Sequence, residues 1–338
     1  MSGEQVLVTG GSGFVGAHCV VRLLLQGYRV RTTVRSAGRA ADLRTMLQAG
    51  GTEPGDALSF AVADLTTDDG WAEAVAGCDY VLHIASPVPL AEPRDENELI
   101  GPARDGVLRV LGAARTAGVK RTVLTSSIVT VKYGHPADKR LFTEQDWTDP
   151  EQGQVSAYAK SKLLAERAAW DFVRKDGQGM ELAVVNPVGI FGPALGPDKS
   201  LWSDQIDRML TGRQPVLARI HIGVVDVRDV ADLHVRAMTD PAAAGERFLA
   251  SAGTMSMQDI AVLLRTRLDD GADRVSTRVL PDWAVRLAAR FSPRIAFVLP
   301  ELGAVREASS EKARRMLGWQ PRPAEEAVID MANSLIRR

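Results

Sequence analysis

A tyrosine and a lysine stand four residues apart in Tyr158-Ala159-Lys160-Ser161-Lys162, within a segment of helical pattern. Residues at this spacing in a helix lie on one face, one turn from each other. A free tyrosine has a pKa near ~10, and a neighbouring ammonium lowers that pKa because it stabilises the phenolate. The pair is therefore typical of an enzyme that uses tyrosine as an acid or base near neutral pH.

The chemistry that needs such a pair is the hydride reduction of a carbonyl, because the product alkoxide must be protonated. We expect Tyr158 to supply the proton, and Lys162 to support it and to hold the hydroxyls of a nicotinamide ribose. A third group has to orient the carbonyl oxygen. Ser127, which ends the segment Leu124-Thr125-Ser126-Ser127, is the expected donor, and Ser126 is the alternative.

A glycine-rich turn follows the first apolar run of the chain. Gln5–Thr9 predicts a buried strand, and Gly10-x-x-Gly13-x-x-Gly16 then opens an apolar helical pattern that extends to about Gln26. In this context glycines permit a tight turn and let the backbone approach a pyrophosphate. The helix N-terminus presents free N–H groups to that phosphate. The alternative is an ordinary structural turn between strand and helix.

The second expected strand, Arg29–Val34, is followed by arginine where sites that prefer NAD carry an acid. From 17 to 41 there are five arginines and no Asp or Glu. A guanidinium binds the 2′-phosphate of NADP, whereas a carboxylate repels it. We therefore expect NADP(H) as cofactor, with Arg35 as the main contact and Arg39 nearby; a solvated basic edge is the alternative. Asp64 is expected to bind the adenine amino group or, equally, to cap the helix after it.

The elements that must position these residues alternate between short apolar runs and helical patterns. This alternation predicts an α/β fold, a doubly wound parallel sheet of the Rossmann type, with ligands at the carboxyl ends of its strands. The further expected strands are Leu58–Ala63, Tyr80–Ile84, Thr122–Thr125 and Leu182–Asn186, and the expected helices include Pro102–Ala117 and Ala157–Lys175.

The sequence pattern changes after Asn186. Residues 187–200 are rich in Pro and Gly, which predicts a loop that crosses a cleft. We expect residues 1–186 to form an NADP-binding domain. Residues 187–338 are expected to form a smaller, mostly C-terminal α/β substrate-binding domain, with 222–235 returning to the first.

Composition excludes several classes of protein. The 338 residues carry 41 basic and 42 acidic side chains, and this balance argues against binding of nucleic acid or of a charged membrane surface. No apolar stretch approaches the ~18 residues of a membrane span, and because the first residues lack the basic region, apolar run and cleavage site of a signal peptide, we expect none. Two cysteines and five histidines without metal spacing predict neither a disulfide framework nor a metal site. We expect a cytoplasmic protein.

On these residues the chain resembles the extended short-chain dehydrogenase/reductase superfamily. Its dihydroflavonol reductase and cinnamoyl-CoA reductase branch, which includes bacterial aldehyde and ketone reductases, is similar in the stretches Tyr28–Arg35, His83–Pro87, Thr125–Ser127, Asn186–Pro187 and Ser310–Pro321. The resemblance implies an NADPH-dependent carbonyl reductase or alcohol dehydrogenase with Tyr158 as acid, Lys162 as its partner and Ser127 as carbonyl donor. The predicted cofactor contacts are Thr9, Gly10, Ser12, Gly13, Phe14, Val15, Gly16, Arg35, Arg39, Asp64, Leu65, Ala85, Ser86, Pro87, Thr125, Tyr158, Lys162, Pro187, Val188 and Ser200.

The resemblance also bears on substrate and assembly. The plant flavonoid enzymes carry an Asn shortly after the catalytic serine that contacts the flavonoid, and Lys132 corresponds to it here. This difference favours another small-molecule carbonyl or alcohol as the substrate. Members of the branch are often monomers or dimers, so a homodimer is one expected assembly.

Two related enzyme classes and one binding protein are the alternatives. Sugar-nucleotide dehydratases typically need carboxylates beside the serine, as in Thr-Asp-Glu, but Thr125-Ser126-Ser127 contains no acid. Sugar-nucleotide epimerases usually retain NAD, which conflicts with the arginines that follow the glycine turn. A hydroxysteroid dehydrogenase stays open as a related variant. A non-catalytic NADP(H) sensor would need no intact set of Ser, Tyr and Lys.

Overall fold

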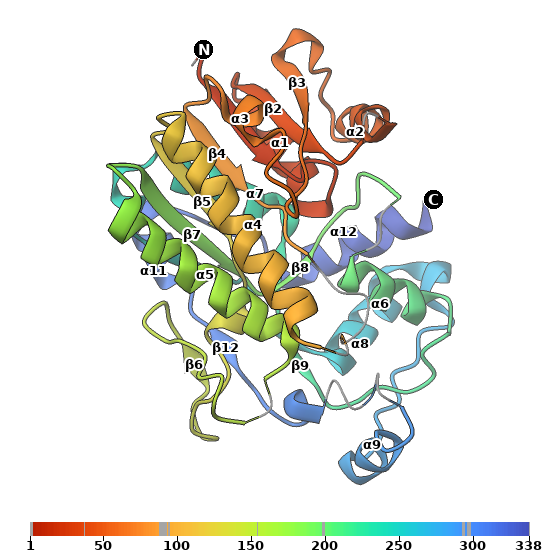
Figure 1. Cartoon of the computed structure of the whole chain (residues 1–338). Coiled ribbons are helices and arrows are strands. Elements are labelled where there is room, and N and C mark those ends of the chain that lie inside the picture. Colours follow the sequence, from red (N-terminus) through yellow and green to blue (C-terminus); the bar gives the residue numbers. More distant parts are fainter. Residues whose placement is uncertain are drawn as a thin grey trace.

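Seven parallel strands form the central sheet of the protein (Figure 1). The structure is a computed structural model, and it describes residues 3–36, 38–87, 93, 95–153, 155–197, 200–292, 295 and 299–337. The strands are β1 (Gln5–Thr9), β2 (Arg29–Val34), β3 (Leu58–Val62), β4 (Tyr80–His83), β5 (Arg121–Thr125), β7 (Glu181–Pro187) and β10 (Arg247–Ala250). Their order, β10-β7-β5-β4-β1-β2-β3, reverses direction between β1 and β4, the point at which such sheets bind ligands. The expected doubly wound α/β fold is confirmed.

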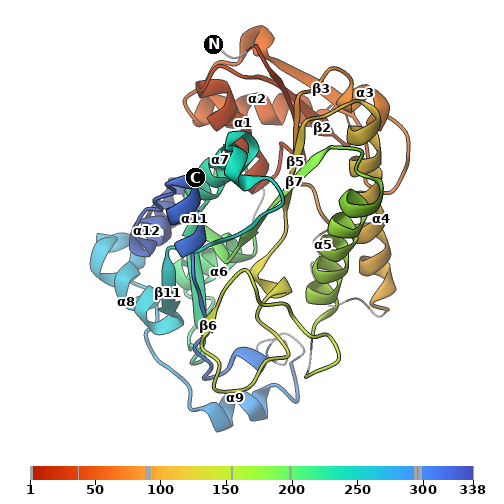
Figure 2. The ribbon, with the colours of Figure 1, turned by 90° about the vertical axis from the view of Figure 1, so that its left-hand side faces the viewer.

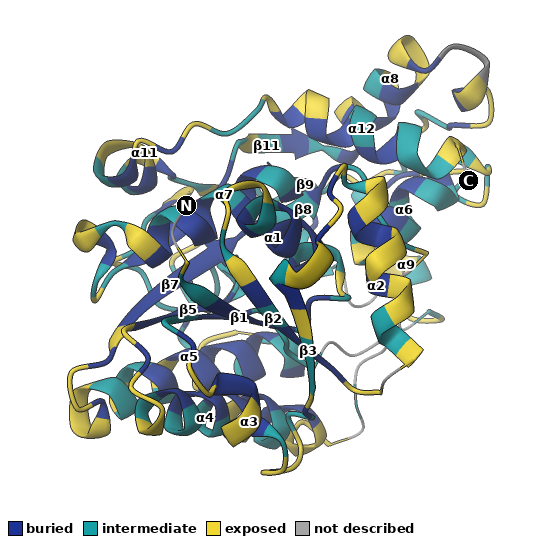
Figure 3. Ribbon diagram, turned by 90° about the horizontal axis from the view of Figure 1, so that it is seen from above, coloured by how far each residue is buried: buried dark blue, intermediate teal, exposed yellow. Residues whose placement is uncertain are grey.

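Helices cover both faces of this sheet (Figure 3). On one face lie α3 (Trp71–Val75), α4 (Asn97–Thr116) and α5 (Ala157–Asp176), and on the other α1 (Phe14–Leu25), α2 (Gly38–Ala49), α7 (Val227–Thr239) and α11 (Glu311–Leu317). Successive side chains of a strand point to opposite faces. Leu7 accordingly packs in one core cluster, whereas Val6 and Val8 pack in the other.

Helix α4 corrects one expected boundary. It begins at Asn97 and includes Pro102, which the sequence analysis placed at its start. A proline inside a helix removes one backbone hydrogen bond. The turn that precedes Pro102 still forms because Leu99 and Ile100 are buried in it.

A smaller sheet completes the fold. It consists of β8 (Gly189–Phe191), β9 (His221–Asp226) and β11 (Gly253–Ser256), and it shares a core cluster with α6 (Leu201–Leu210), α8 (Met257–Arg267) and α12 (Ala324–Ile336). Helix α7 follows β9 directly and packs on α1, and β10 joins the large sheet beside β7. The division at residue 186, with 222–235 returning to the first domain, stays a prediction.

The lower part of the molecule carries loops and short elements (Figure 2). Strands β6 (Leu141–Phe142) and β12 (Glu307–Ala308) pair in parallel and so join the chain after β5 to the C-terminal segment. Helix α9 (Asp282–Ala288) lies at the same end. Among the helices that the structure describes, none is both long and apolar enough to span a bilayer.

Candidate active site

The glycine turn connects β1 to α1 and requires glycine at two positions. Gly10 has a φ of +69°, in the left-handed region, and its carbonyl accepts a hydrogen bond from Gly13 N at 2.9 Å. A Cβ on Gly16 would lie 2.1 Å from that same carbonyl oxygen. Gly13 is the N-cap of α1, and no described side chain caps this helix start. The turn therefore fits a dinucleotide, because its free N–H groups can face a pyrophosphate.

The end of β4 is tied to this turn by Thr9. Its hydroxyl accepts hydrogen bonds from Ile84 N and Ala85 N, both at 3.0 Å, and lies 2.8 Å from His83 Nδ1. A Cβ on Gly10 would lie 3.1 Å from Ala85. The buried Nε2 of His83 has no partner among the described residues. The imidazole of His83, which Lys162 influences electrostatically, therefore has one ring nitrogen without a described hydrogen-bond partner.

Arg35 lies at the cofactor end of β2, directly after the last residue of the strand, and its side chain is exposed. Arg39, in α2, pairs with Asp42 at 3.5 Å. Asp64 accepts hydrogen bonds from the backbone and the hydroxyl of Thr66, which lower the pKa of Asp64, with smaller contributions from Arg35 and Arg109. Asp64 thus holds its own turn rather than the start of α3, and Arg35 is near enough to act on it electrostatically.

Ser127, Tyr158 and Lys162 come together at the carboxyl edge of the sheet. Ser127 follows β5 and caps a short 3₁₀ helix, Ile128–Thr130, while α5 carries Tyr158 and Lys162 on one face. Tyr158 hydrogen-bonds Ser127, and Lys162 Nζ donates to the carbonyl of Thr125 at 3.4 Å. The rival serine, Ser126, donates its hydroxyl to Glu166 Oε2 at 2.5 Å.

The electrostatics of this group differ from the sequence-based expectation. Burial raises the pKa of Tyr158, and the hydrogen bond with Ser127 opposes that rise. Burial also lowers the pKa of Lys162 to about 8, and the charge of Glu166 opposes this fall. Burial and Ser127 are the described causes of the Tyr158 pKa shift, and the Lys162 ammonium donates to the carbonyl of Thr125.

Three further predicted cofactor contacts, Pro187, Val188 and Ser200, have different surroundings in the structure. Pro187 and Val188 are buried where β7 ends, at the same sheet edge as Ser127. Ser200 is the N-cap of α6, and its hydroxyl accepts from Ser203 N at 3.1 Å in a capping box. Ser200 therefore has a structural partner, and its role toward a cofactor stays a prediction.

Two buried residues at the site were missed from the sequence. His234, in α7, lies with Nε2 2.7 Å from the hydroxyl of Thr125 and Nδ1 2.7 Å from the carbonyl of Val230. Glu166, in α5, is fully buried. Glu166 could have been found, because it continues the four-residue spacing from Tyr158 through Lys162 on one helix face.

We expect acid to destabilise the protein through His83 and His234. Burial lowers the pKa of His83 to about 3 and the pKa of His234 to about 4, below the unfolded value of 6.5. The stability that these two neutral histidines contribute is fully present above pH 6.5. It is lost as the pH falls toward their pKa values in the folded protein, because the unfolded chain binds protons that the folded protein does not. Each histidine should lower the free energy of unfolding by about 1.4 kcal/mol per pH unit in that window.

Urea unfolding of the cofactor-free protein between neutral and mildly acidic pH measures this loss. His234→Gln should reduce the slope, because it removes one of the two groups that take up the extra protons. A free energy of unfolding that does not change as the pH falls through this window contradicts the prediction.

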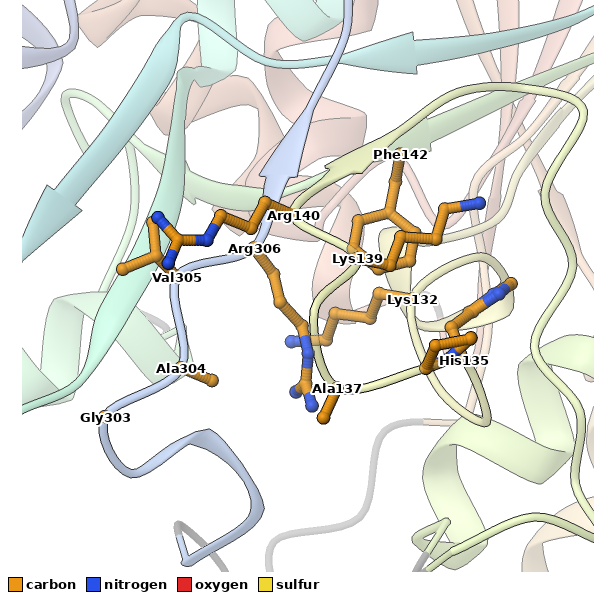
Figure 4. Close-up of a pocket in the computed structure, with 11 residues that line it drawn as sticks. Lys132, His135, Ala137, Lys139, Arg140, Phe142, Gly303, Ala304, Val305 and Arg306 are labelled. Atoms are coloured by element: carbon orange, nitrogen blue, oxygen red, sulfur yellow. The ribbon is translucent and has the colours of Figure 1, made fainter.

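Two cavities lie beside the loop that follows Ser127. The larger, about 550 Å³, is bordered by Tyr133, Gly134, His135, Gln152, Gly153, Arg286, Leu299, Pro300 and Arg306. The smaller, about 130 Å³, lies between this loop and residues 303–306 (Figure 4), and there Lys132 and Arg306 lie close together. Both pair with Glu301, at 2.8 and 3.2 Å. Glu301 thus holds in place two side chains, Lys132 and Arg306, that line the smaller cavity.

Fold and site together define an oxidoreductase of the α/β class. The chain belongs to the NAD dependent epimerase/dehydratase family, whose model matches residues 6–250. Ketoreductase azaE of Aspergillus niger is 31% identical over 355 residues, covering 99% of this chain and 98% of its own. Cinnamoyl-CoA reductase 1 of Arabidopsis thaliana is 33% identical over 267 residues, with 78% and 75% covered.

A solved structure shows a likeness over nearly the whole chain. The yeast methylglyoxal/isovaleraldehyde reductase Gre2, complexed with NADPH, superposes with a TM-score of 0.80 and 25% identity, covering 98% of both chains. These relatives confirm the resemblance to the extended short-chain dehydrogenase/reductase superfamily and to its dihydroflavonol reductase and cinnamoyl-CoA reductase branch.

Proposed function

We propose that the protein reduces a ketone or aldehyde to an alcohol, reversibly, with NADPH as the reductant. The observation that carries the proposal is the placement of Ser127, Tyr158 and Lys162 at the sheet edge beside the glycine turn. Reductases among the relatives, and the NADPH complex of the yeast structure, support it.

The residues of this chain have distinct parts in the reaction. NADPH, when bound, supplies the hydride that reduces the carbonyl carbon. The N–H groups at the start of α1 hold its pyrophosphate, and Lys162 holds the ribose hydroxyls. Ser127 donates a hydrogen bond to the carbonyl oxygen, and Tyr158 then gives that oxygen a proton. Because burial raises the pKa of Tyr158, the phenol is protonated at neutral pH, which suits the direction of reduction.

The sugar-nucleotide epimerase is the less favoured alternative. It would share the fold and the Tyr/Lys pair, but relatives such as ketoreductase azaE and cinnamoyl-CoA reductase 1 are named as reductases. A hydroxysteroid dehydrogenase fits the same Ser, Tyr and Lys set and differs only in substrate. Loss of NADPH absorbance, followed over a panel of aryl ketones, ketoesters, aldehydes and ketosteroids with a UDP-sugar as control, tests these options together.

Arg35 is proposed to select NADPH over NADH. We expect Arg35→Ala to reduce the ratio of kcat/KM for NADPH to that for NADH by about 10- to 100-fold, since a charge-assisted contact with the 2′-phosphate is worth ~1.5–3 kcal/mol. Arg29→Ala is a matched control, because Arg29 is an exposed arginine at the opposite end of β2. A ratio that stays at the wild-type value in Arg35→Ala removes this assignment.

Two further predictions concern the cellular location and the oligomeric state of the protein. A homodimer is tested by sedimentation of the purified protein over a range of concentrations, and a cytoplasmic location by fractionation of the source cells. Neither affects the chemistry proposed for Tyr158.

A further inference from the structure

Glu166 is a charged residue placed where charge is costly. It lies one turn beyond Lys162 and two turns beyond Tyr158 on α5, and its side chain is 0% exposed. A buried carboxylate destabilises a protein unless its oxygens are paired and hydrogen-bonded. The hydrogen-bond partners of the Glu166 carboxylate therefore indicate the role of its charge.

Hydrogen-bond donors from three segments converge on the carboxylate of Glu166. Its Oε2 accepts from the hydroxyls of Ser126 at 2.5 Å and Thr130 at 2.9 Å, and from Nδ2 of Asn186 at 2.8 Å. Its Oε1 forms an ion pair with Arg247 Nε at 2.6 Å. All these partners are themselves buried.

The partners of Glu166 surround Ser127. Ser126 precedes it, and Thr130 ends the short helix that Ser127 caps. Asn186, in β7, reaches the carbonyl of Ser127 with the same amide nitrogen that binds Glu166, at 3.4 Å. The carboxylate thus fastens the segment that carries Ser127 to the helix that carries Tyr158 and Lys162.

Arg247 supplies the countercharge from the edge strand β10. Its guanidinium lies 3.6 Å from the ring centroid of Trp147, and it donates to the carbonyls of Glu144 at 3.0 Å and Asp146 at 3.1 Å. These contacts hold the guanidinium of Arg247 in one position. The ion pair with Glu166 therefore has one defined geometry.

Glu166 also acts on the charge of Lys162. Burial lowers the pKa of Lys162, and Glu166 opposes that change. The other groups that face Lys162 among the described residues are His83 from β4, which is neutral, Tyr158 from α5 and the carbonyl of Thr125 from β5. Glu166 is thus the one described carboxylate that stabilises the ammonium.

We propose that Glu166 is a positioning residue for proton transfer, which holds Ser127 against the Tyr158 helix and keeps the Lys162 ammonium charged at the working pH. The proposal rests on the proposed carbonyl reductase function, because it assigns Glu166 a part in the same site. Glu166 itself touches neither substrate nor cofactor.

The first test follows Lys162 without any substrate. NMR of isotope-labelled lysine side chains in the cofactor-free protein, with the Lys162 signal assigned from Lys162→Arg, gives the midpoint of its titration. In Glu166→Gln we expect that midpoint to fall by about one pH unit, since a neighbouring opposite charge has been removed. This readout remains valid even if the wild type reduces no carbonyl, so failure of the proposed function is distinguished from failure of this inference.

The second test follows turnover. We expect Glu166→Gln to lower kcat for carbonyl reduction by about 10- to 100-fold, less than the roughly 10²- to 10⁴-fold loss of the general acid itself, and to move the alkaline limb of the pH profile to lower pH. Glu166→Asp should recover part of both. Glu181→Gln is the matched control, because Glu181 pairs with the buried Arg121 at 2.6 Å, away from Tyr158, and should leave kcat unchanged.

A third variant separates positioning from folding. Glu166→Gln leaves Arg247 buried without a countercharge, so the double variant Glu166→Gln/Arg247→Met removes both charges and is expected to fold where the single variant does not. The double variant should keep the low kcat and the lowered Lys162 midpoint. Wild-type kcat with a wild-type Lys162 titration, in either variant, overturns the proposal and leaves Glu166 a structural residue.

Discussion

Replacement of Tyr158 by Phe is expected to lower kcat for carbonyl reduction by about a hundred- to ten-thousand-fold, the usual contribution of a general acid. The variant loses only the hydroxyl that bonds Ser127, and the ring still fills its partly buried position. We therefore expect its Kd for NADPH, measured by fluorescence titration, to stay close to the wild-type value.

Tyr80→Phe is the control for this experiment. Tyr80 begins β4 at the amino end of the sheet, away from Ser127 and Lys162, so the loss of its hydroxyl should leave kcat unchanged. Full turnover in Tyr158→Phe, with the control also active, contradicts Tyr158 as the proton donor. A fall in both kcat and NADPH affinity instead assigns Tyr158 to cofactor binding.

Replacement of Gly16 by Ala has the second large expected effect. The new Cβ would lie 2.1 Å from the carbonyl oxygen of Gly10 and 2.8 Å from the Cα of Gly11. Both neighbours are backbone atoms, so the turn itself must move. We expect a loss of about 1–3 kcal/mol of stability from overpacking, and weaker NADPH binding because the N–H groups of the turn are displaced.

A second helical glycine provides a control in which the change to alanine should raise the stability of the protein instead of lowering it. A Cβ on Gly112, in α4, would meet no atom within 4 Å. Gly112→Ala should therefore stabilise the protein by about 0.5–1 kcal/mol through helix propensity, with NADPH affinity unchanged. Urea unfolding and fluorescence titration of the two variants measure both effects. Wild-type stability and affinity in Gly16→Ala contradict a tightly packed turn.

Most strands of the central sheet were predictable because they are short apolar runs with distinct ends. β1 and β2 match their expected bounds, and β4, β5 and β7 differ by a residue at one or both ends. Helix α2 and strand β10 are two of the elements that were not predicted. Helix α2 has almost no amphipathic pattern, with only Leu43, Met46 and Leu47 buried. Strand β10 has four residues, too few to show a period, and only its pairing with β7 makes it a strand.

The candidate site was predictable in part, for a similar reason. Local spacing identified the glycine turn and the pair of Tyr158 and Lys162, since each depends on neighbours within one turn of backbone. The pKa of Tyr158 was misjudged because desolvation depends on atoms that the rest of the fold brings near. The cavities beside Tyr133 depend on residues near 300, far away in the chain.

The amino-acid sequence by itself determined the fold class, the turn that needs Gly10 and Gly16, and the helix face that presents Tyr158 and Lys162. These follow from short-range geometry, which the order of residues dictates directly. Only the tertiary structure distinguishes Ser126 from Ser127. Glu166, from another element, accepts a hydrogen bond from the hydroxyl of Ser126, whereas Ser127 hydrogen-bonds Tyr158, and the role of Ser127 as carbonyl donor stays a prediction. Two adjacent serines are alike in sequence, and they differ only in what the folded chain places opposite each hydroxyl.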